Sequence, residues 1–173
     1  LFAKFSRPTA RVKWSDKAIV VERGGKRLLQ FRMANERANQ IVEAQLRLAL
    51  ARTETSPDGE RMRRFHDLKL QRDRNVIFVL TWTAVHEIDE SSPLYGLGIE
   101  QMQEQSVQLI ASLIGLDETF SQQVHARHYY VPEDLVFDMR FADILGVAPD
   151  GSRYVDYARF DEVVPMGTKT EIS

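Results

Sequence analysis

The sequence predicts an all-β domain built as a two-sheet sandwich. Short segments rich in β-branched and aromatic residues are separated by turn signals that recur along the chain, and one segment alternates strictly between apolar and polar residues. β-Branched and aromatic side chains favour strands, and short strands divided by frequent turns are typical of sandwiches. The 173 residues suffice for one domain with a substantial core.

The alternating segment spans residues 42–50. Its apolar face carries Val42, Ala44, Leu46, Leu48 and Leu50, and Glu43 lies on the opposite, more polar face. A period of two predicts a half-buried strand. A helix is the rival interpretation, because Ala, Leu, Glu and Gln favour helix. The clean alternation and the turn sequence at 56–59 that follows favour the strand.

The remaining elements follow from turn signals and composition. Gly and Pro supply the backbone angles that turns require, so their clusters mark the ends of strands. One short helix is expected after Pro93 and the glycines at 96 and 98, and the tail from residue 165 is expected to fray. The expected strands cover residues 18–22, 28–33, 77–83, 141–145 and 154–157, and the expected helix covers residues 99–105.

Charge is distributed unevenly along the chain. Residues 1–40 hold ten Lys and Arg against three Asp and Glu, whereas residues 117–173 hold five against eleven. The basic end therefore predicts an anionic partner, and the acidic remainder argues against nucleic-acid binding. The chain has no Cys, which excludes disulfides and Cys-based metal or nucleophile sites. No run of about 18 apolar residues is present, so no membrane-spanning helix is expected.

Nothing in the sequence predicts catalysis or a metal site. His125 and His128 are three apart on an expected strand, so they face opposite sides of it, and two histidines alone make a poor zinc site. The carboxylate pairs at 89–90 and 117–118 resemble loop acids. No nucleophile stands at motif spacing from a base, and no phosphate-binding glycine motif is present. We therefore expect a protein that is not an enzyme and has no cofactor.

Several segments resemble one known family. The segment His86–Tyr95 resembles a loop that recurs in the cytoplasmic domains of inward-rectifier potassium channels. The opening residues 1–8, which lack an initiator Met, resemble the end of that family's inner pore helix. Residues 32–44 and 113–127 resemble further family segments in the same order, and residues 63–68 and 124–128 are most similar to prokaryotic members.

The resemblance implies an immunoglobulin-like β-sandwich with one or two short helices, assembled as a homotetramer that extends the ion path. It implies a division into an inner-helix end and linker (1–14), a cytoplasmic pore domain (15–164) and a flexible tail (165–173). The partners implied are identical subunits, the chain's own transmembrane pore domain and anionic phosphoinositide lipid, at the cytoplasmic face of a bacterial inner membrane. The permeant ion would be K⁺, with Mg²⁺ or polyamines as pore blockers. The alternative is a free-standing β-sandwich interaction domain without a channel role.

The resemblance also implies roles for individual residues. Lys4, Arg7 and Arg37 match lipid-contacting or lipid-coupled positions, and Glu43 matches a carboxylate that faces the cytoplasmic pore. An ion pair between Glu118 and Arg127 is implied at the base of the gating loop. Ile114 replaces an acidic pore residue of strong rectifiers, which predicts weak polyamine block. The implied gating loop comprises Asp117, Glu118, Thr119, Phe120, Ser121, Gln122, Gln123 and Val124.

Overall fold

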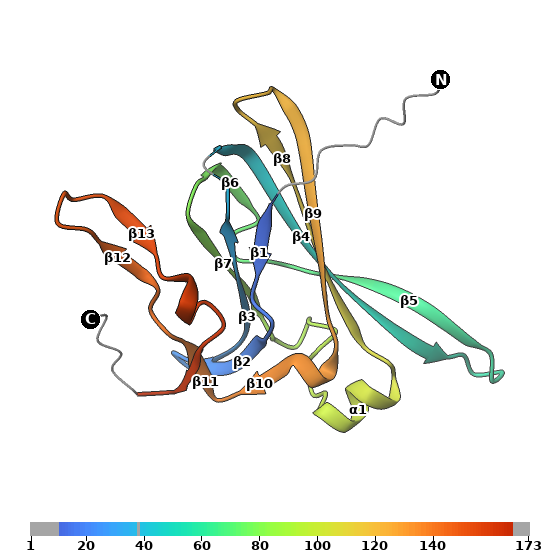
Figure 1. Ribbon diagram of the computed structural model, residues 1–173. Coiled ribbons are helices and arrows are strands. Elements are labelled where there is room, and N and C mark those ends of the chain that lie inside the picture. Colours follow the sequence, from blue (N-terminus) through green and yellow to red (C-terminus); the bar gives the residue numbers. More distant parts are fainter. Residues whose placement is uncertain (1–10, 38, 168–173) are drawn as a thin grey trace, which may run out of the picture.

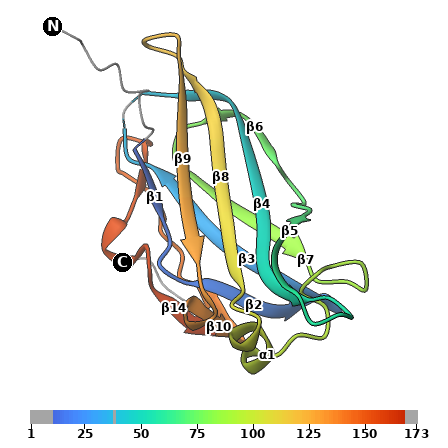
Figure 2. The ribbon, with the colours of Figure 1, turned by 90° about the vertical axis from the view of Figure 1, so that its right-hand side faces the viewer.

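The computed structural model describes residues 11–37 and 39–167 and shows two β-sheets packed face to face (Figures 1 and 2). The first half of the chain contributes β1 (Val12–Trp14), β2 (Ala18–Arg23), β3 (Lys26–Asn35), β4 (Ile41–Thr55), β5 (Arg61–Leu68), β6 (Arg74–Phe78) and β7 (Thr81–Glu87). The second half contributes α1 (Ile99–Glu104), β8 (Gln108–Asp117), β9 (Gln122–Tyr130), η1 (Pro132–Asp134), β10 (Leu135–Phe137), β11 (Met139–Phe141), β12 (Leu145–Val147), β13 (Arg153–Val155), η2 (Tyr157–Arg159) and β14 (Val163–Pro165). The predicted all-β sandwich with a short helix is confirmed.

Each sheet is organised around one long central strand. In the first sheet β3 pairs with β7 on one edge and with β2 and β1 on the other, and β10 extends this sheet by pairing in parallel with β2. In the second sheet β4 pairs with β8 on one edge and with β5 and β6 on the other, and β9 extends it beside β8. The β12–β13 hairpin and the antiparallel pair β11–β14, which encloses it in the sequence, form the C-terminal part.

The core lies between the two sheets and uses the apolar faces of both central strands. Phe31 and Met33 of β3 and Leu46 and Leu50 of β4 belong to one buried cluster, each at most 1 % exposed. Burying one such side chain stabilises the fold by about 1.5–3 kcal/mol. The alternating residues of β4 therefore lie on two faces of the strand, one in the core and one outside it.

Two strand predictions need correction. Residues 77–83 do not form one strand, because bends at Val79 and Leu80 separate β6 in one sheet from β7 in the other. The turn lets the chain change sheets while Phe78 and Trp82 both stay buried and meet edge to face at 5.8 Å. The predicted segment 141–145 likewise divides between β11 and β12.

The predicted boundaries shift slightly. Val12–Trp14 pairs with β3, so regular structure begins before residue 15, and the antiparallel pair β11–β14 continues it to Pro165. The helix predicted at 99–105 is confirmed as α1. Residues 1–10 and 168–173, which carry most of the predicted linker and tail, lie outside the described residues.

Candidate functional site

Glu43 lies in a β-bulge of β4. The pairing with β8 shifts between Val42 and Gln45, so residues 43 and 44 together oppose the single residue Gly115. Glu43 has a φ of 49°, in the left-handed region that non-glycine residues seldom adopt, and its side chain is exposed. Bulges re-aim side chains and often lie near functional sites.

The bulge also corrects the predicted alternation. Ala44, Leu46, Leu48 and Leu50 are buried as expected, but Val42 is only half-buried and Ile41 takes the core position. One extra residue in a strand moves every later side chain to the opposite face of the sheet, because side chains alternate with a period of two. A count of residues along the sequence could not reveal this slip.

Gly115 is the residue that permits the bulge. A Cβ placed on it would lie 2.4 Å from Cγ2 of Ile41 and 3.3 Å from the carbonyl oxygen of Val42. A Cβ at position 115 would therefore clash with the Ile41 side chain unless that side chain or the strands moved. The requirement for glycine comes from contact, since Gly115 has no positive φ.

The predicted gating loop is the connection between β8 and β9. Asp117 and Gln122 form the last pair of the hairpin, so the turn itself comprises residues 118–121. Phe120 at this turn is 64 % exposed, and Gln122 and Gln123 are exposed within β9. Val124 is buried opposite Gly115, so it belongs to the core and does not line the loop.

Asp117 fastens this loop to the chain before β4. Its carboxylate accepts hydrogen bonds from the backbone N–H groups of Thr119 at 2.9 Å and Phe120 at 3.3 Å. The other carboxylate oxygen meets the Asn39 amide at 3.4 Å and the Arg37 guanidinium at 4.0 Å. Asp117 is only 4 % exposed, so these donors replace the water that it loses.

Arg37 therefore has a structural neighbour that the sequence did not reveal. Its backbone N–H also donates to the side-chain oxygen of Asn35, whose amide donates to the carbonyls of Asn39 and Phe78. The β3–β4 connection is thus ordered by Asn35 and joined to the β8–β9 hairpin through Asp117. An Asp can accept a hydrogen bond from the backbone N–H two residues further on, and Asp117 at the end of an expected strand was the available clue.

Glu118 and Arg127 do not meet within one chain. Arg127 pairs with Ser112, five positions along the ladder from the Asp117–Gln122 pair that closes the hairpin. At about 3.4 Å per residue this separates them by about 17 Å along the strands. Within the described residues of one chain the two side chains form no ion pair, and the Glu118–Arg127 pair stays a prediction. Lys4 and Arg7 lie outside the described residues.

Arg32 pins the C-terminal segment onto the first sheet. It is 5 % exposed, and its guanidinium donates to the carbonyl oxygens of Phe160, Ala142 at 2.7 Å and Arg159 at 3.0 Å. Its plane also lies 4.5 Å from the Phe141 ring centroid. Burial lowers the pKa of Arg32 to about 10, which still leaves it charged at neutral pH.

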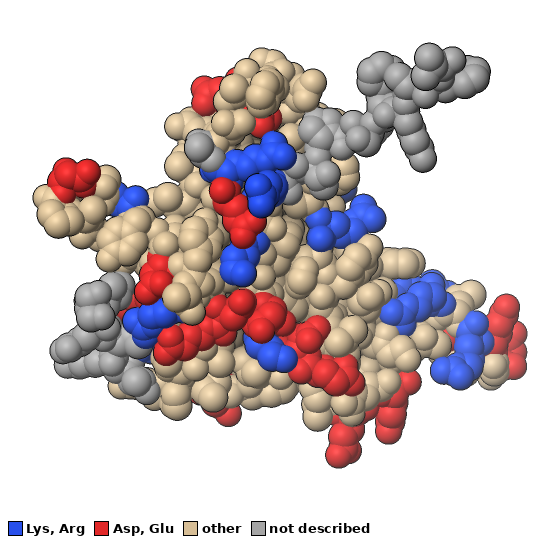
Figure 3. All heavy atoms as spheres, in the orientation of Figure 1, with Lys and Arg blue, Asp and Glu red and all other residues tan. Residues whose placement is uncertain are grey.

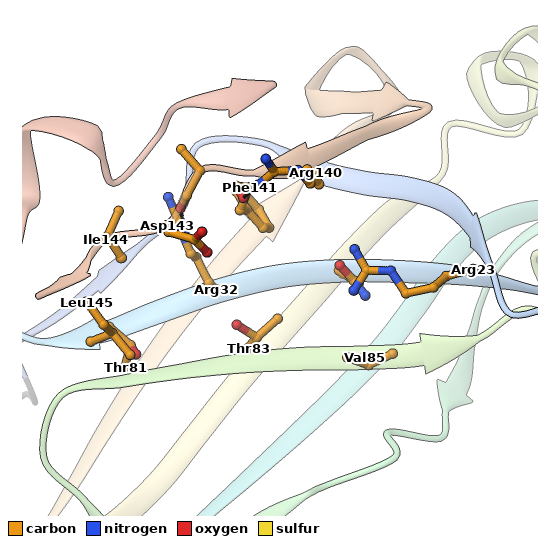
Figure 4. Close-up of a pocket in the computed structure, with 12 residues that line it drawn as sticks. Arg23, Arg32, Thr81, Thr83, Val85, Arg140, Phe141, Asp143, Ile144 and Leu145 are labelled. Atoms are coloured by element: carbon orange, nitrogen blue, oxygen red, sulfur yellow. Dashed lines mark hydrogen bonds between the residues drawn. The ribbon is translucent and has the colours of Figure 1, made fainter. Parts of the chain in front are cut away.

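A hollow lies beside Arg32. It has a volume of about 690 Å³ and is lined by Arg23, Arg32 and Arg140 together with Thr81, Thr83 and Asp143 (Figure 4). The N–H groups of Arg32 already donate to backbone carbonyls, so Arg32 is not placed to bind a ligand in this hollow. The hollow is an open groove beneath the C-terminal segment, lined mainly by polar and charged side chains.

On the face shown in Figure 3, Asp and Glu form an irregular band below the middle, with Lys and Arg interspersed and more frequent above it. Within residues 11–37 and 39–167, no group of three or more potential ligands is placed to hold a metal ion. In the same residues, no helix combines the length and hydropathy needed to cross a membrane.

The described residues thus define a β-sandwich whose distinctive features are a bulged strand with an outward carboxylate and a hairpin loop fastened at its base. The chain matches the family model of the inward rectifier potassium channel C-terminal domain over residues 12–172, and it belongs to that family. Because this is a family of channel domains, the prediction that the chain is not an enzyme is confirmed.

Two relatives illustrate the match. Inward rectifier potassium channel Kirbac3.1 of Paramagnetospirillum magnetotacticum is 40 % identical over 163 residues, which cover 94 % of this chain and 55 % of that protein. Inward rectifier potassium channel 4 of Homo sapiens is 34 % identical over 173 residues, which cover 92 % of this chain and 37 % of that protein. The chain therefore spans about half the length of these relatives, or less. The predicted family is confirmed.

Proposed function

We propose that this chain is the cytoplasmic regulatory and pore-extending domain of a homotetrameric inward-rectifier K⁺ channel at a bacterial inner membrane. Membership of the channel family over residues 12–172 is the observation that carries the proposal. The outward Glu43 and the fastened loop at 117–123 are the features through which the domain would act. Its partners would be three identical subunits and its own transmembrane pore domain.

Glu43 would line the aqueous path. The bulge exposes its carboxylate on the outer face of the β4–β8–β9 sheet. Four carboxylates around one axis would concentrate K⁺ and attract Mg²⁺ or polyamines. Glu43→Gln should lower single-channel conductance and weaken internal cation block, most clearly at low salt, where screening is least. Unchanged conductance and block in low salt would remove Glu43 from the path.

The β8–β9 loop would gate the path at the axis. Phe120 is exposed at its turn and Ile114, also exposed, supplies no charge to the outer face, which agrees with weak polyamine block. The chain has no Cys, so a single cysteine can be introduced at this turn. In the complete channel, Phe120→Cys should allow Cd²⁺ to block K⁺ flux, because four thiolates would meet at the axis.

The matched control for that experiment is Val147→Cys. Val147 is 67 % exposed on the β12–β13 hairpin, far along the chain from the loop. Cd²⁺ should leave its flux unchanged. Equal Cd²⁺ sensitivity of both variants, or none in either, would argue against convergence of the loops.

Anionic phosphoinositide would act at the membrane side through Lys4, Arg7 and Arg37. Arg37 is suited to relay this binding, since its guanidinium also lies 4.0 Å from the buried Asp117 at the loop base. Neutralising Lys4 and Arg7 should weaken binding to phosphoinositide vesicles and flatten its salt dependence. Binding that is unchanged across a salt series would exclude both residues from the site.

The Glu118–Arg127 pair remains a proposal only between neighbouring subunits. Both side chains are exposed, so each is available to an adjacent copy. In the complete channel, exchanging the two charges should restore part of the open probability that each single reversal changes. Additive effects would show that the two residues do not interact.

A further inference from the structure

Four rings join the edge strands of the two sheets. His128 on β9 stacks on Trp14 of β1, with ring centroids 5.7 Å apart and planes 8° apart. His128 also meets Tyr130 edge to face at 4.7 Å, and Tyr130 contacts Phe31 of β3 at 5.4 Å. Strands β1 and β9 lie side by side in both ribbon views (Figures 1 and 2).

A hydrogen-bonded connection lies directly beside this stack. The fully buried Tyr130 donates its hydroxyl hydrogen to the Ser15 carbonyl at 2.8 Å. Ser15 Oγ in turn donates to the Lys17 carbonyl at 2.9 Å and accepts from the Arg32 N–H at 3.1 Å. The chain just after β1 is therefore held to β9 by a fixed hydrogen bond as well as by stacked rings.

This contact joins the strand that follows the proposed gating loop to the strand that follows the basic N-terminal segment. β9 begins at Gln122, immediately after the turn of the proposed gating loop, and carries His128 six residues further on. β1 follows, in the sequence, the basic segment that holds Lys4 and Arg7. A rigid link between β1 and β9 would make displacement of one strand displace the other.

We propose that Trp14 and His128 form a proton-sensitive clasp that couples the position of β1 to the gating loop. His128 is a positioning residue in this proposal: it acts through β9 and does not touch the ion. The coupling to gating rests on the function proposed above, whereas the clasp itself does not.

The charges around His128 set the direction of its response to pH. Asp16, from the β1–β2 connection, and Asp134, from η1, favour the charged imidazolium, but burial outweighs them and lowers the pKa of His128 below its usual 6.5. Lys13 of β1 lies near Asp161 and over the Phe160 ring. The ring is therefore neutral at pH 7 and becomes charged only in mild acid.

Acid should loosen the clasp. A charged imidazolium must leave water to stay stacked in this half-buried position, and its cation–π attraction to Trp14 offsets only part of that cost. Burial and Asp161 also raise the pKa of Asp16, so this counter-charge begins to disappear at a higher pH than for an ordinary Asp. Both changes weaken the hold of β9 on β1.

Tryptophan emission tests the clasp in the chain itself. The chain has two Trp, so Trp82→Phe leaves Trp14 as the sole indole. Protonated imidazole quenches a stacked indole more strongly than neutral imidazole. Protonation changes both the quenching power of the imidazole and its contact with the indole, so emission should change on acidification, with a midpoint below pH 6.5, and His128→Phe should abolish the titration while keeping a stacked ring. If Trp82→Phe fails to fold, the difference in emission between the parent and His128→Phe gives the same readout.

His125→Phe is the matched control, because His125 is exposed on the same strand. It should leave the titration unchanged. A titration that persists in His128→Phe, or that is absent from the parent, would overturn the clasp.

The coupling requires the complete channel. Ion flux into liposomes should change between about pH 7.5 and about pH 5.5, the range in which His changes charge. That change should be lost in His128→Phe and kept in His125→Phe. An emission titration combined with a pH response of flux that His128→Phe leaves intact would overturn the coupling. A parent channel without K⁺ flux would instead count against the proposed function, which the emission experiment does not depend on.

Discussion

The β8–β9 and β4–β5 hairpins both reach beyond the sandwich, yet they are held by carboxylates in opposite settings (Figure 1). At the first, Asp117 is buried and accepts two backbone hydrogen bonds. At the second, Glu54 has a side chain that is 30 % exposed and contacts Arg52 at 2.9 Å, Arg64 at 3.1 Å and His66 at 2.8 Å.

The comparison shows that the number of ion pairs is a poor guide to rigidity. Glu54 has two arginines and a histidine as neighbours, but water and salt screen each of these contacts. Asp117 has one distant cation, but its backbone donors are fixed by the turn that they help to form. We therefore expect the β8–β9 loop to keep one shape and the β4–β5 arm to tolerate substitution.

Gly115→Ala should have the largest effect on stability. Its new Cβ would lie 2.4 Å from Ile41 Cγ2, so the bulge or the Ile41 side chain must move. Overpacking of this kind costs about 1–3 kcal/mol. Chemical denaturation of the chain would measure the loss, and an unchanged unfolding midpoint would show that the two strands separate easily.

Two controls sharpen this prediction. Gly59→Ala in the β4–β5 turn meets no atom within 4 Å and is strained only by its φ of +87°. Adding Ile41→Ala to Gly115→Ala removes the clashing methyl group, so the double variant should lose less stability than the sum of the two single variants. Strict additivity would place the cost of Gly115→Ala elsewhere.

Asp117→Ala should have a smaller but clear effect. It removes the acceptor of the Thr119 and Phe120 N–H groups, and lost hydrogen bonds to a charged group cost about 1.5–3 kcal/mol, less what water recovers at this exposed turn. Hydrogen exchange of these two amides should accelerate. Asp117→Asn keeps an acceptor oxygen and should retain most of their protection, whereas equal acceleration in both variants would make the charge itself decisive.

Most of the fold followed from local patterns. Alternation at 42–50 and the turn signals gave the strands, because facing and turn formation depend on neighbouring residues. The bulge at Glu43 and the bend at Val79 were not foreseen, because each is set by pairing with strands far away in the sequence. The register between β8 and β9, which separates Glu118 from Arg127, was hidden for the same reason.

The candidate site divides in a similar way. Resemblance selected Glu43 and the 117–124 loop, but it could not show that Asp117 is buried against Arg37 and Asn39. The clue for Arg32 was an arginine within an apolar strand segment, which indicates a buried and fully bonded guanidinium. His128 gave no such clue, since its partner Trp14 lies in another sheet.

Glu54→Gln should have the smallest effect on stability, and its pH dependence identifies the cause. Hydrogen bonds from Arg52, and then from His66, hold the pKa of Glu54 below its usual 4.5. A carboxylate with a lowered folded pKa stabilises the fold above its unfolded pKa, and this contribution disappears as pH falls through the folded value. Parent and Glu54→Gln should therefore differ slightly at pH 7 and converge as pH falls below the lowered folded pKa of Glu54, where the carboxylate is protonated in both states. High salt should shrink the difference at pH 7, because all four side chains reach solvent. Denaturant midpoints at the two pH values, with and without salt, would measure this. A difference that persists in acid or resists salt would mean that Glu54 holds its arm by packing, as Asp117 holds its loop, and the contrast between the two hairpins would fail.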